Sequence, residues 1–357
     1  MSEKLPINSK FNGLTVYPVP NYDSSYIRLD RNENYCIPKE YISYLVEKAV
    51  KDVDLRLYPS IDLLIREISS RFAYDEKYIA VANGGDDILY KISLAMLRSG
   101  GDAIITPPTY SMYRWIIERC GGDVKEVLLK GDFSLDVEGI LESYNDRTKL
   151  ILISNPNNPT GNLFRKNSIV KLLENVDALV VIDEAYGEFS GESSIDLLSR
   201  GFENLVIVKT FSKLGFAGVR LGYALGRGKL MEYIKKYIPP YNINSFSIQA
   251  GVYIIREYDR IMFYIEKCIE ERTFMLESLK EMEGFIAYPS KTNFILVRSL
   301  VQPVNTIIKG LLRHKIVVKD LSSQPLLENC FRVTVGDRDM NRQFLTIFKK
   351  IMGGDGT

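Results

Sequence analysis

The first two thirds of the chain alternate between short apolar runs and longer segments with helical periodicity. The apolar runs are too short for helices and several are rich in Val and Ile; they lie at Tyr78–Ala82, Ala103–Thr106, Lys149–Ser154, Ala178–Ile182 and Leu205–Lys209. Helical periodicity falls between some of them, at Asp86–Arg98, Ser111–Cys120 and Ser168–Asn175. Strands that alternate with helices indicate a mostly parallel sheet covered on both faces. The sequence therefore predicts an α/β fold.

The pattern changes after residue 245. A long amphipathic helix is expected over Asp259–Met282, with Gly284 as its stop signal. Strands then alternate with helices; the strands are expected at Asn293–Val297, Ile316–Lys319 and Phe331–Val335, and the helices at Val304–Arg313 and Met340–Met352. This indicates a smaller α+β unit. We divide the chain into an N-terminal arm that is part of the small domain (1–37), a large domain (38–245) and a small C-terminal domain (246–357).

Composition argues against several functions. The 46 Lys and Arg against 45 Asp and Glu leave a net charge of +1, so the chain lacks the basic field that nucleic acids or anionic membranes attract. His314 is the single histidine and the four cysteines are widely spaced. No metal site, disulfide framework or histidine-dependent hydrolase is therefore expected. With no signal peptide and no membrane-spanning stretch in the sequence, a cytoplasmic location is expected.

Polar and small residues follow each predicted strand of the large domain. These segments are Asn83–Asp87, Pro107–Tyr110, Asn155–Gly161, Asp183–Tyr186 and Thr210–Lys213. Ligands of open α/β sheets bind outside the carboxyl ends of the strands. The five segments are therefore expected to meet at one pocket.

Some of these residues suit a phosphate group. Gly85 and Asp86 begin a helix, whose free backbone N–H groups can bind an anion. Thr210, Ser212 and Arg220 add hydroxyl and guanidinium donors. Each feature also has an ordinary alternative, because a glycine pair can simply cap a helix and a single arginine can be a surface charge.

Three further residues supply an acid, an amine and an aromatic ring. Asp183 ends an apolar run, where a buried carboxylate is unfavourable without a cationic partner. Lys213 follows another buried strand, where desolvation would favour the nucleophilic amine. Tyr110 offers a ring for stacking. With the phosphate donors, this set indicates pyridoxal 5′-phosphate (PLP), which proteins hold by a lysine Schiff base and an acid at the pyridinium nitrogen.

Several ordered motifs together resemble those of the class I and II PLP-dependent aminotransferases. They are Asn157–Gly161, Asp183–Tyr186, Ser212–Lys213 and Ala217–Tyr223. Within this family the chain is most similar to the histidinol-phosphate aminotransferases, on the basis of Arg31–Asn34, Tyr58–Pro59, Pro107–Tyr113 and Phe331–Gly336. The resemblance runs from about residue 28 to 350. It implies fold type I, in which a mostly parallel seven-stranded sheet lies between helices and a smaller α+β domain is attached.

The resemblance also implies a role for each matching residue. Lys213 would form the Schiff base and then move the substrate proton, and Asp183 would keep the pyridine nitrogen protonated. Asn158 and Tyr186 would hydrogen-bond the phenolic oxygen of PLP, and Tyr110 would stack on its ring. The remaining matches would bind the phosphate; they are Gly85, Asp86, Thr210, Ser212 and Arg220.

Two further matches, one arginine and one tyrosine, concern the substrate and the assembly. Arg332 matches the arginine that binds the substrate α-carboxylate as a bidentate pair. Tyr58 matches a tyrosine that reaches the phosphate from a partner subunit, so a homodimer with shared active sites is expected.

The chain departs from the family pattern at two positions. The Asn32–Asn34 segment, which helps to shape the substrate pocket, continues as Tyr35–Pro38 rather than with an early proline and glycine. Lys319 stands where histidinol-phosphate aminotransferases carry an arginine for the substrate phosphate. A lysine meets a phosphate as a point charge, without the bidentate fork.

Three functions follow from this pattern. The leading one is an aminotransferase that exchanges the amino group of glutamate with a small, phosphorylated amine or carbonyl compound. The alternative is a PLP-dependent decarboxylase of serine or threonine phosphate, which would use nearly the same cofactor motifs. A cofactor-binding sensor is disfavoured, because little chain precedes the match and the net charge is close to zero.

Overall fold

The seven-stranded sheet of the α/β fold is present in the computed structural model, which describes residues 16 and 20–353. Its strand order is β2-β8-β7-β6-β5-β3-β4. Only β8 runs antiparallel to its neighbours in this sheet. The strands are β2 (Ile79–Ala82), β3 (Asp102–Ile105), β4 (Asp123–Glu126), β5 (Thr148–Ser154), β6 (Leu179–Asp183), β7 (Leu205–Thr210) and β8 (Gly222–Leu225).

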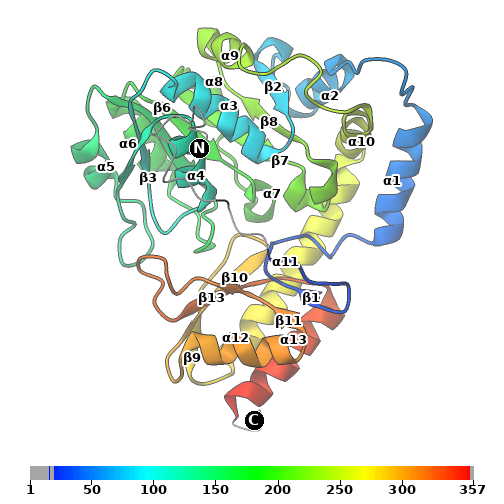
Figure 1. Ribbon diagram of the computed structural model, residues 1–357, viewed down its shortest axis with the longest axis vertical. Helices are drawn as coiled ribbons and strands as arrows, with labels where there is room; N and C mark the ends of the chain where they lie inside the picture. The colour runs from blue at the N-terminus through cyan, green and yellow to red at the C-terminus, as the bar shows by residue number, and fades with distance from the viewer. Residues whose placement is uncertain (1–15, 17–19, 354–357) are drawn as a thin grey trace, which may run out of the picture.

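Helices cover both faces of this large sheet (Figure 1). On β6, Val181 packs into the core of one face, whereas Val180 and Ile182 pack into the core of the other, as the two-residue period of a strand requires. One face carries α3 (Gly85–Leu97), α4 (Met112–Arg119) and α9 (Gly228–Lys235). The other core includes residues of α2 (Asp62–Phe72), α5 (Val137–Ser143), α6 (Lys166–Asn175), α7 (Gly187–Ser190), α8 (Ile195–Ser199) and α10 (Ser245–Arg256).

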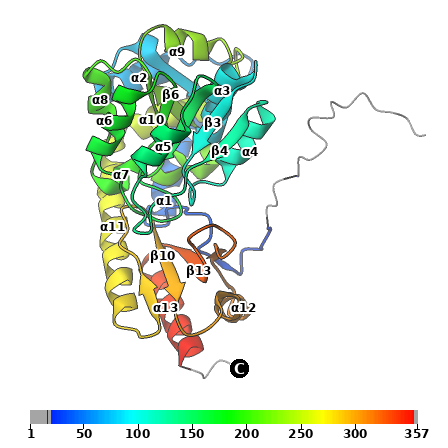
Figure 2. The same cartoon turned by 90° about the vertical axis from the view of Figure 1, so that its left-hand side faces the viewer.

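A second, antiparallel sheet forms the smaller unit, in the order β12-β13-β10-β9. Its strands are β9 (Phe285–Ala287), β10 (Phe294–Ser299), β12 (Lys319–Asp320) and β13 (Cys330–Thr334). The helices of this unit are α11 (Tyr258–Lys280), α12 (Val304–Arg313) and α13 (Arg338–Met352). Figure 2 shows α11 running down one side of the molecule, from the large sheet to the small one.

The N-terminal part of the chain crosses between the two units. β1 (Ile27–Arg28) pairs in parallel with β11 (Ile316–Val317) in the smaller unit. After β1 the chain passes the carboxyl edge of the large sheet and enters α1 (Lys39–Lys51), which packs on α10. The segment between β1 and α1 is therefore placed between the two units, next to the ends of the central strands.

The predicted fold class is confirmed: an α/β layer with a mostly parallel seven-stranded sheet and a smaller α+β unit. The division at residues 245 and 246 stays a prediction, and α10, which begins at that point, packs against α1 and α2. Residues 1–15 of the predicted arm lie outside the described residues. No helix within the described part of the chain is long and apolar enough to cross a membrane.

Candidate active site

Asp183 lies buried at the carboxyl end of β6, the central strand of the large sheet. Its Oδ2 accepts a hydrogen bond of 2.9 Å from the Tyr113 hydroxyl, and its Oδ1 accepts one of 3.1 Å from the Ala185 backbone N–H. Burial raises the pKa of Asp183 to about 6, although both hydrogen bonds act in the opposite direction. This carboxylate is oriented by two donors but has no cation among these contacts to neutralise it.

Tyr110 and Tyr113 stand together beside this carboxylate. Their rings meet edge to face, with centroids 5.5 Å apart. The Tyr110 hydroxyl donates to Asp86 Oδ1 at 3.0 Å, so this ring is fixed between the start of α3 and the start of α4. Burial raises the pKa of Tyr110 well above its ordinary value, and Asp86 raises it further. Both phenols are therefore neutral hydrogen-bond donors over the physiological pH range.

Lys213 lies just beyond the end of β7, in a single 3₁₀ turn at Ser212–Leu214. Its Nζ donates a hydrogen bond of 3.0 Å to the carbonyl oxygen of Arg31 and lies 5.8 Å from the centre of the Tyr186 ring. The ammonium group therefore bridges the large sheet and the segment between β1 and α1. A primary amine in this position, held by a single backbone carbonyl, is accessible for covalent chemistry.

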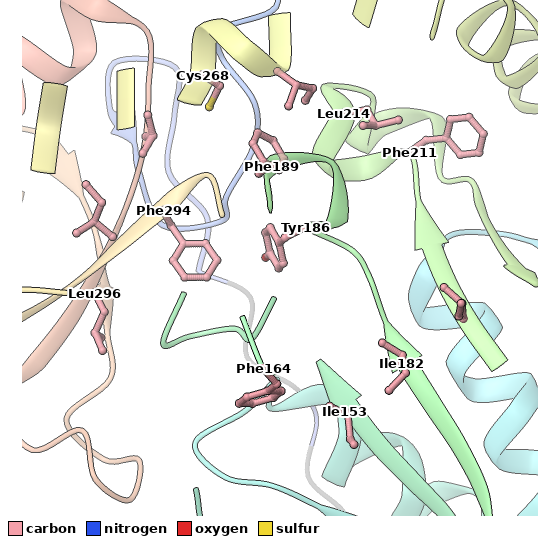
Figure 3. Packing of buried hydrophobic residues seen from close by; sticks show 14 of the residues in the cluster. Ile153, Phe164, Ile182, Tyr186, Phe189, Phe211, Leu214, Cys268, Phe294 and Leu296 are labelled. Carbon is pink, nitrogen blue, oxygen red and sulfur yellow. The ribbon is translucent and has the colours of Figure 1, made fainter. Parts of the chain in front are cut away.

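Tyr186 and Asn32 form a buried pair between the two units. Asn32 Nδ2 donates to the Tyr186 hydroxyl at 2.8 Å, and Asn32 Oδ1 accepts from the Thr334 hydroxyl at 3.2 Å. Asn32 adopts a left-handed backbone conformation (φ 57°), and its carbonyl oxygen accepts from Asn293 Nδ2. The Tyr186 ring faces Phe294 of β10 edge to face, as Figure 3 shows. This pair fixes the orientation of the Tyr186 hydroxyl.

Arg332 lies on β13 with its guanidinium group buried against the large sheet. Nη1 donates to Asn158 Oδ1, and Nη2 donates to the carbonyl oxygen of Asp30 at 2.7 Å. The guanidinium carbon lies 5.1 Å from the centre of the Phe294 ring. Asn158 and Arg332, which are 174 positions apart in the chain, are thus brought into direct contact.

Lys319 is the strand partner of Arg332 in the antiparallel pair β12–β13. Directly opposed residues of an antiparallel pair have side chains on the same face of the sheet. Lys319 is exposed to solvent, whereas Arg332 is buried. The two cations therefore lie on one face, with Lys319 nearer to solvent.

A small cradle forms where β2 and β7 end and β8 begins. A Cβ atom at Gly84 would lie 3.0 Å from Nη2 of Arg220, and one at Gly85 would lie 3.5 Å from Cβ of Thr210. The hydroxyl groups of Thr210 and Ser212 are 3.0 Å apart. Gly85 and Asp86 open α3, so their free backbone N–H groups belong to the same cradle. Donors of this kind around a glycine turn suit a phosphate group.

Tyr58 differs from the other predicted site residues. It is 81% exposed and its ring stacks on Tyr241, with centroids 4.7 Å apart. The structure thus places it on the surface within its own chain. The remaining predicted residues gather at the carboxyl edge of the large sheet and the facing edge of the small one.

Three residues of the site were not among those predicted. Tyr113 donates to Asp183, Thr334 holds Asn32, and Phe294 packs on both Tyr186 and Arg332. Tyr113 could have been found, because it lies in the first turn of the predicted helix over Ser111–Cys120, directly after the segment that ends in Tyr110. The positions of Thr334 and Phe294 in the site depend on the pairing of the small sheet, which no local sequence pattern predicts.

Comparison with known proteins identifies the family. Residues 25–348 match the model of the family described as Aminotransferase class I and II. A histidinol-phosphate aminotransferase of Clostridium novyi (strain NT) is 34% identical over 327 residues, which cover 90% of this chain and 91% of that protein.

Solved structures share the fold. The histidinol-phosphate aminotransferase from Sinorhizobium meliloti, in complex with pyridoxal-5′-phosphate, gives a TM-score of 0.83 at 20% identity and covers 92% of this chain and 91% of that one. The L-threonine-O-3-phosphate decarboxylase from Porphyromonas gingivalis gives a TM-score of 0.79 at 23% identity and covers 92% of this chain and 99% of that one. The family match spans nearly all of the described residues and includes every predicted site residue; this chain is a member of the class I and II aminotransferases.

Proposed function

We propose that this enzyme binds PLP and exchanges the amino group of glutamate with a small, phosphorylated amine or carbonyl compound of the histidinol phosphate type. The observation that carries the proposal is the convergence of Lys213, Asp183 and Arg332 on one site from three separate parts of the fold. An amine, a buried acid and a carboxylate-binding arginine are the groups that transamination of an amino acid requires.

The residues of the site fit PLP. The Gly84–Gly85 turn with Arg220, Thr210 and Ser212 would hold the phosphate, because a Cβ atom at Gly84 would crowd the Arg220 guanidinium group and narrow the cradle. Asp183, whose ionisation is unfavourable in its buried position, would gain a cationic partner in the pyridinium nitrogen. Tyr110 would lie against the ring. PLP bound here would accept the electron pair left on the substrate when its Cα–H bond breaks.

The protein groups supply the positioning and the proton transfer. Lys213 would attach the cofactor and, once released, carry the proton from the substrate Cα. The Tyr186 hydroxyl and Asn158 would orient the phenolic oxygen of the cofactor. Arg332 would bind the α-carboxylate. This contact would replace one or both of its hydrogen bonds to Asn158 and Asp30. Lys319, on the same face as Arg332 and nearer to solvent, would meet the phosphate of the substrate.

A homodimer is part of this proposal. Tyr58 is exposed together with Leu55 and Leu57, which precede it in the chain, and with Tyr241, on which its ring stacks. An exposed apolar patch of this kind marks an interface, and a partner subunit would bring Tyr58 to the phosphate cradle of the other chain. Sedimentation analysis should give a dimer, and Tyr58→Ala should weaken PLP binding. A monomer with full PLP affinity would contradict this part of the proposal.

The decisive experiment separates transamination from decarboxylation. The purified enzyme with PLP is given glutamate alone, and the absorbance of the bound cofactor and the formation of 2-oxoglutarate are followed. Histidinol phosphate, histidinol and threonine phosphate are then compared as further substrates. Release of CO₂ from threonine phosphate without any keto acid would favour the decarboxylase. Failure of the half-reaction with every amino acid would overturn the proposed function.

A further inference from the structure

A buried lysine with two carboxylate partners lies next to the site but takes no part in the chemistry above. Lys209, on β7, is 4% exposed. Its Nζ is 3.3 Å from Oε2 of Glu184 and 3.0 Å from Oε1 of Glu188, and both carboxylates are buried. Burial alone would lower the pKa of Lys209, but Glu188 and Glu184 together raise it above its ordinary value. The lysine therefore stays charged.

Further donors complete this network. The Ser193 hydroxyl donates to Glu184 Oε2 at 2.6 Å, and the backbone N–H of Ser194 donates to Glu184 Oε1. The Tyr258 hydroxyl donates to Glu188 Oε1 at 2.8 Å. The two carboxylates thus share one ammonium and three further hydrogen-bond donors. A buried ionic network of this kind is stable only while every partner is present.

The network encloses the turn that carries two residues of the site. Glu184 directly follows Asp183, and Glu188 lies two positions after Tyr186. Between them, a Cβ atom at Gly187 would lie only 3.1 Å from Lys209 Nζ. The chain from Asp183 to Glu188 therefore wraps around the ammonium group. Lys209 itself directly precedes Thr210 of the phosphate cradle.

The same turn is tied to the long helix α11. Tyr258, which binds Glu188, is the first residue of α11. Further along this helix, the buried Arg272 donates to the carbonyl oxygens of Phe189 (3.3 Å) and Thr292 (2.8 Å). In Figure 2, α7 lies beside the upper end of α11, and Figure 3 places Phe189 close to Tyr186. The turn is thus held between β7 and the helix that leads into the smaller unit.

We propose that Lys209 is a positioning residue, which holds the Asp183–Glu188 turn so that the Asp183 carboxylate and the Tyr186 hydroxyl face the cofactor that Lys213 carries. The inference rests on the proposed function, because it assigns the cofactor to this site. A buried ion network adds little stability relative to apolar groups of the same size. The network as a whole therefore serves to fix this geometry, and loss of Lys209 alone also destabilises the protein because it leaves two buried carboxylates without a cation.

The experiment uses the full-length enzyme and four variants. Lys209→Arg keeps the charge, Lys209→Met removes it, and the triple variant Lys209→Met/Glu184→Gln/Glu188→Gln removes the whole ionic network. Lys77→Met, at an exposed ion pair with Asp75, is the matched control. The melting temperature, the dissociation constant for PLP, and kcat and KM for glutamate are measured for each.

Lys209→Met and the triple variant should weaken PLP binding and lower kcat by about 10- to 100-fold, as loss of a group that orients a ligand-binding residue does in metal sites. KM for glutamate should change less than threefold, because Arg332 lies outside the network. Lys209→Arg should recover most of the loss, and Lys77→Met should behave as wild type. The triple variant should melt close to the wild-type temperature.

Two results would overturn the inference. One is a triple variant that folds and keeps wild-type PLP affinity and kcat. The other is a loss in PLP affinity or kcat that simply follows the melting temperature across the series, which would make Lys209 a stability residue only. PLP affinity and melting are measured without substrate, so they test Lys209 even where the wild-type enzyme shows no transamination. A wild-type enzyme that shows no transamination would count against the proposed function and not against the role of Lys209.

Discussion

The Tyr113 hydroxyl donates a 2.9 Å hydrogen bond to the Asp183 carboxylate, at the centre of the candidate site. Both groups are buried, and the bond joins α4 to the end of β6. Burial raises the pKa of Asp183, and this hydrogen bond lowers it. Tyr113 therefore favours the ionised form of Asp183, which is the form that would bind a pyridinium nitrogen.

Tyr113→Phe should weaken PLP binding and slow the half-reaction with glutamate. A hydrogen bond to a charged group contributes about 1.5 to 3 kcal/mol, which corresponds to a loss of about 10- to 100-fold. Equilibrium dialysis of PLP and single-turnover absorbance changes measure the two effects. Tyr110→Phe is the control, because it keeps the ring and removes only the bond to Asp86. Unchanged PLP affinity in Tyr113→Phe would exclude this role.

The stability of the PLP-free protein should depend on the ionisation of Asp183. Its folded pKa of about 6 lies above the ordinary value of 3.8, so the folded state binds the proton more tightly than the unfolded state does. The contribution of this group to the free energy of unfolding should therefore fall as the pH rises from about 4 to 7, by about 3 kcal/mol at most.

Asp183→Asn removes this titration. Denaturant unfolding of the wild-type and variant apoproteins is measured from pH 4 to 7. The free energy of unfolding of the variant should exceed that of the wild type by an amount that grows with pH and levels off above about pH 7. A difference that does not change with pH would show that the carboxylate has an ordinary pKa. The same variant should lower the turnover of the PLP-loaded enzyme by about 10² to 10⁴-fold.

Lys213→Ala should abolish turnover and leave the fold intact. The side chain is only partly buried, and within the described residues its hydrogen bond goes to the Arg31 carbonyl, so its removal disturbs little packing. Residual activity should be below about a hundredth of the wild-type rate, because the covalent step is lost. Borohydride reduction followed by peptide mass spectrometry should place PLP on Lys213 in the wild type. A tag on another lysine would contradict the assignment.

Five strands of the large sheet could be predicted from the sequence, whereas β4 and β8 of that sheet and β9 of the small one could not. β2, β3, β5, β6 and β7 are apolar runs followed by polar residues, so these strands and the polar segments at their ends could be located from local patterns. The edge strand β4 is not an apolar run and was not predicted. β8, by contrast, begins within the Ala217–Tyr223 motif, where the glycines and Arg220 interrupt any strand periodicity. Its antiparallel pairing with β2 and β7 could not be predicted from local pattern.

Contacts between distant segments were the other limit. The Asn32–Tyr186 bond and the Arg332–Asn158 bond join residues 154 and 174 positions apart. These two hydrogen bonds depend on how the smaller unit packs against the large sheet, and no periodicity in the sequence predicts that packing. The resemblance to a family implies roles for these residues but not their partners, and the sequence pattern places Lys209 only at the end of a strand.

Arg332→Lys should raise KM for glutamate by about 10- to 100-fold and leave PLP affinity unchanged. A lysine keeps the charge but loses the planar fork that binds a carboxylate through two parallel hydrogen bonds. Lys319→Ala is the matched comparison on the neighbouring strand. It should raise KM for a phosphorylated substrate and leave KM for glutamate unchanged, because Lys319 lies nearer to solvent. If Lys319→Ala impaired both substrates equally, or Arg332→Lys impaired neither, the two cations would not have the separate roles proposed here.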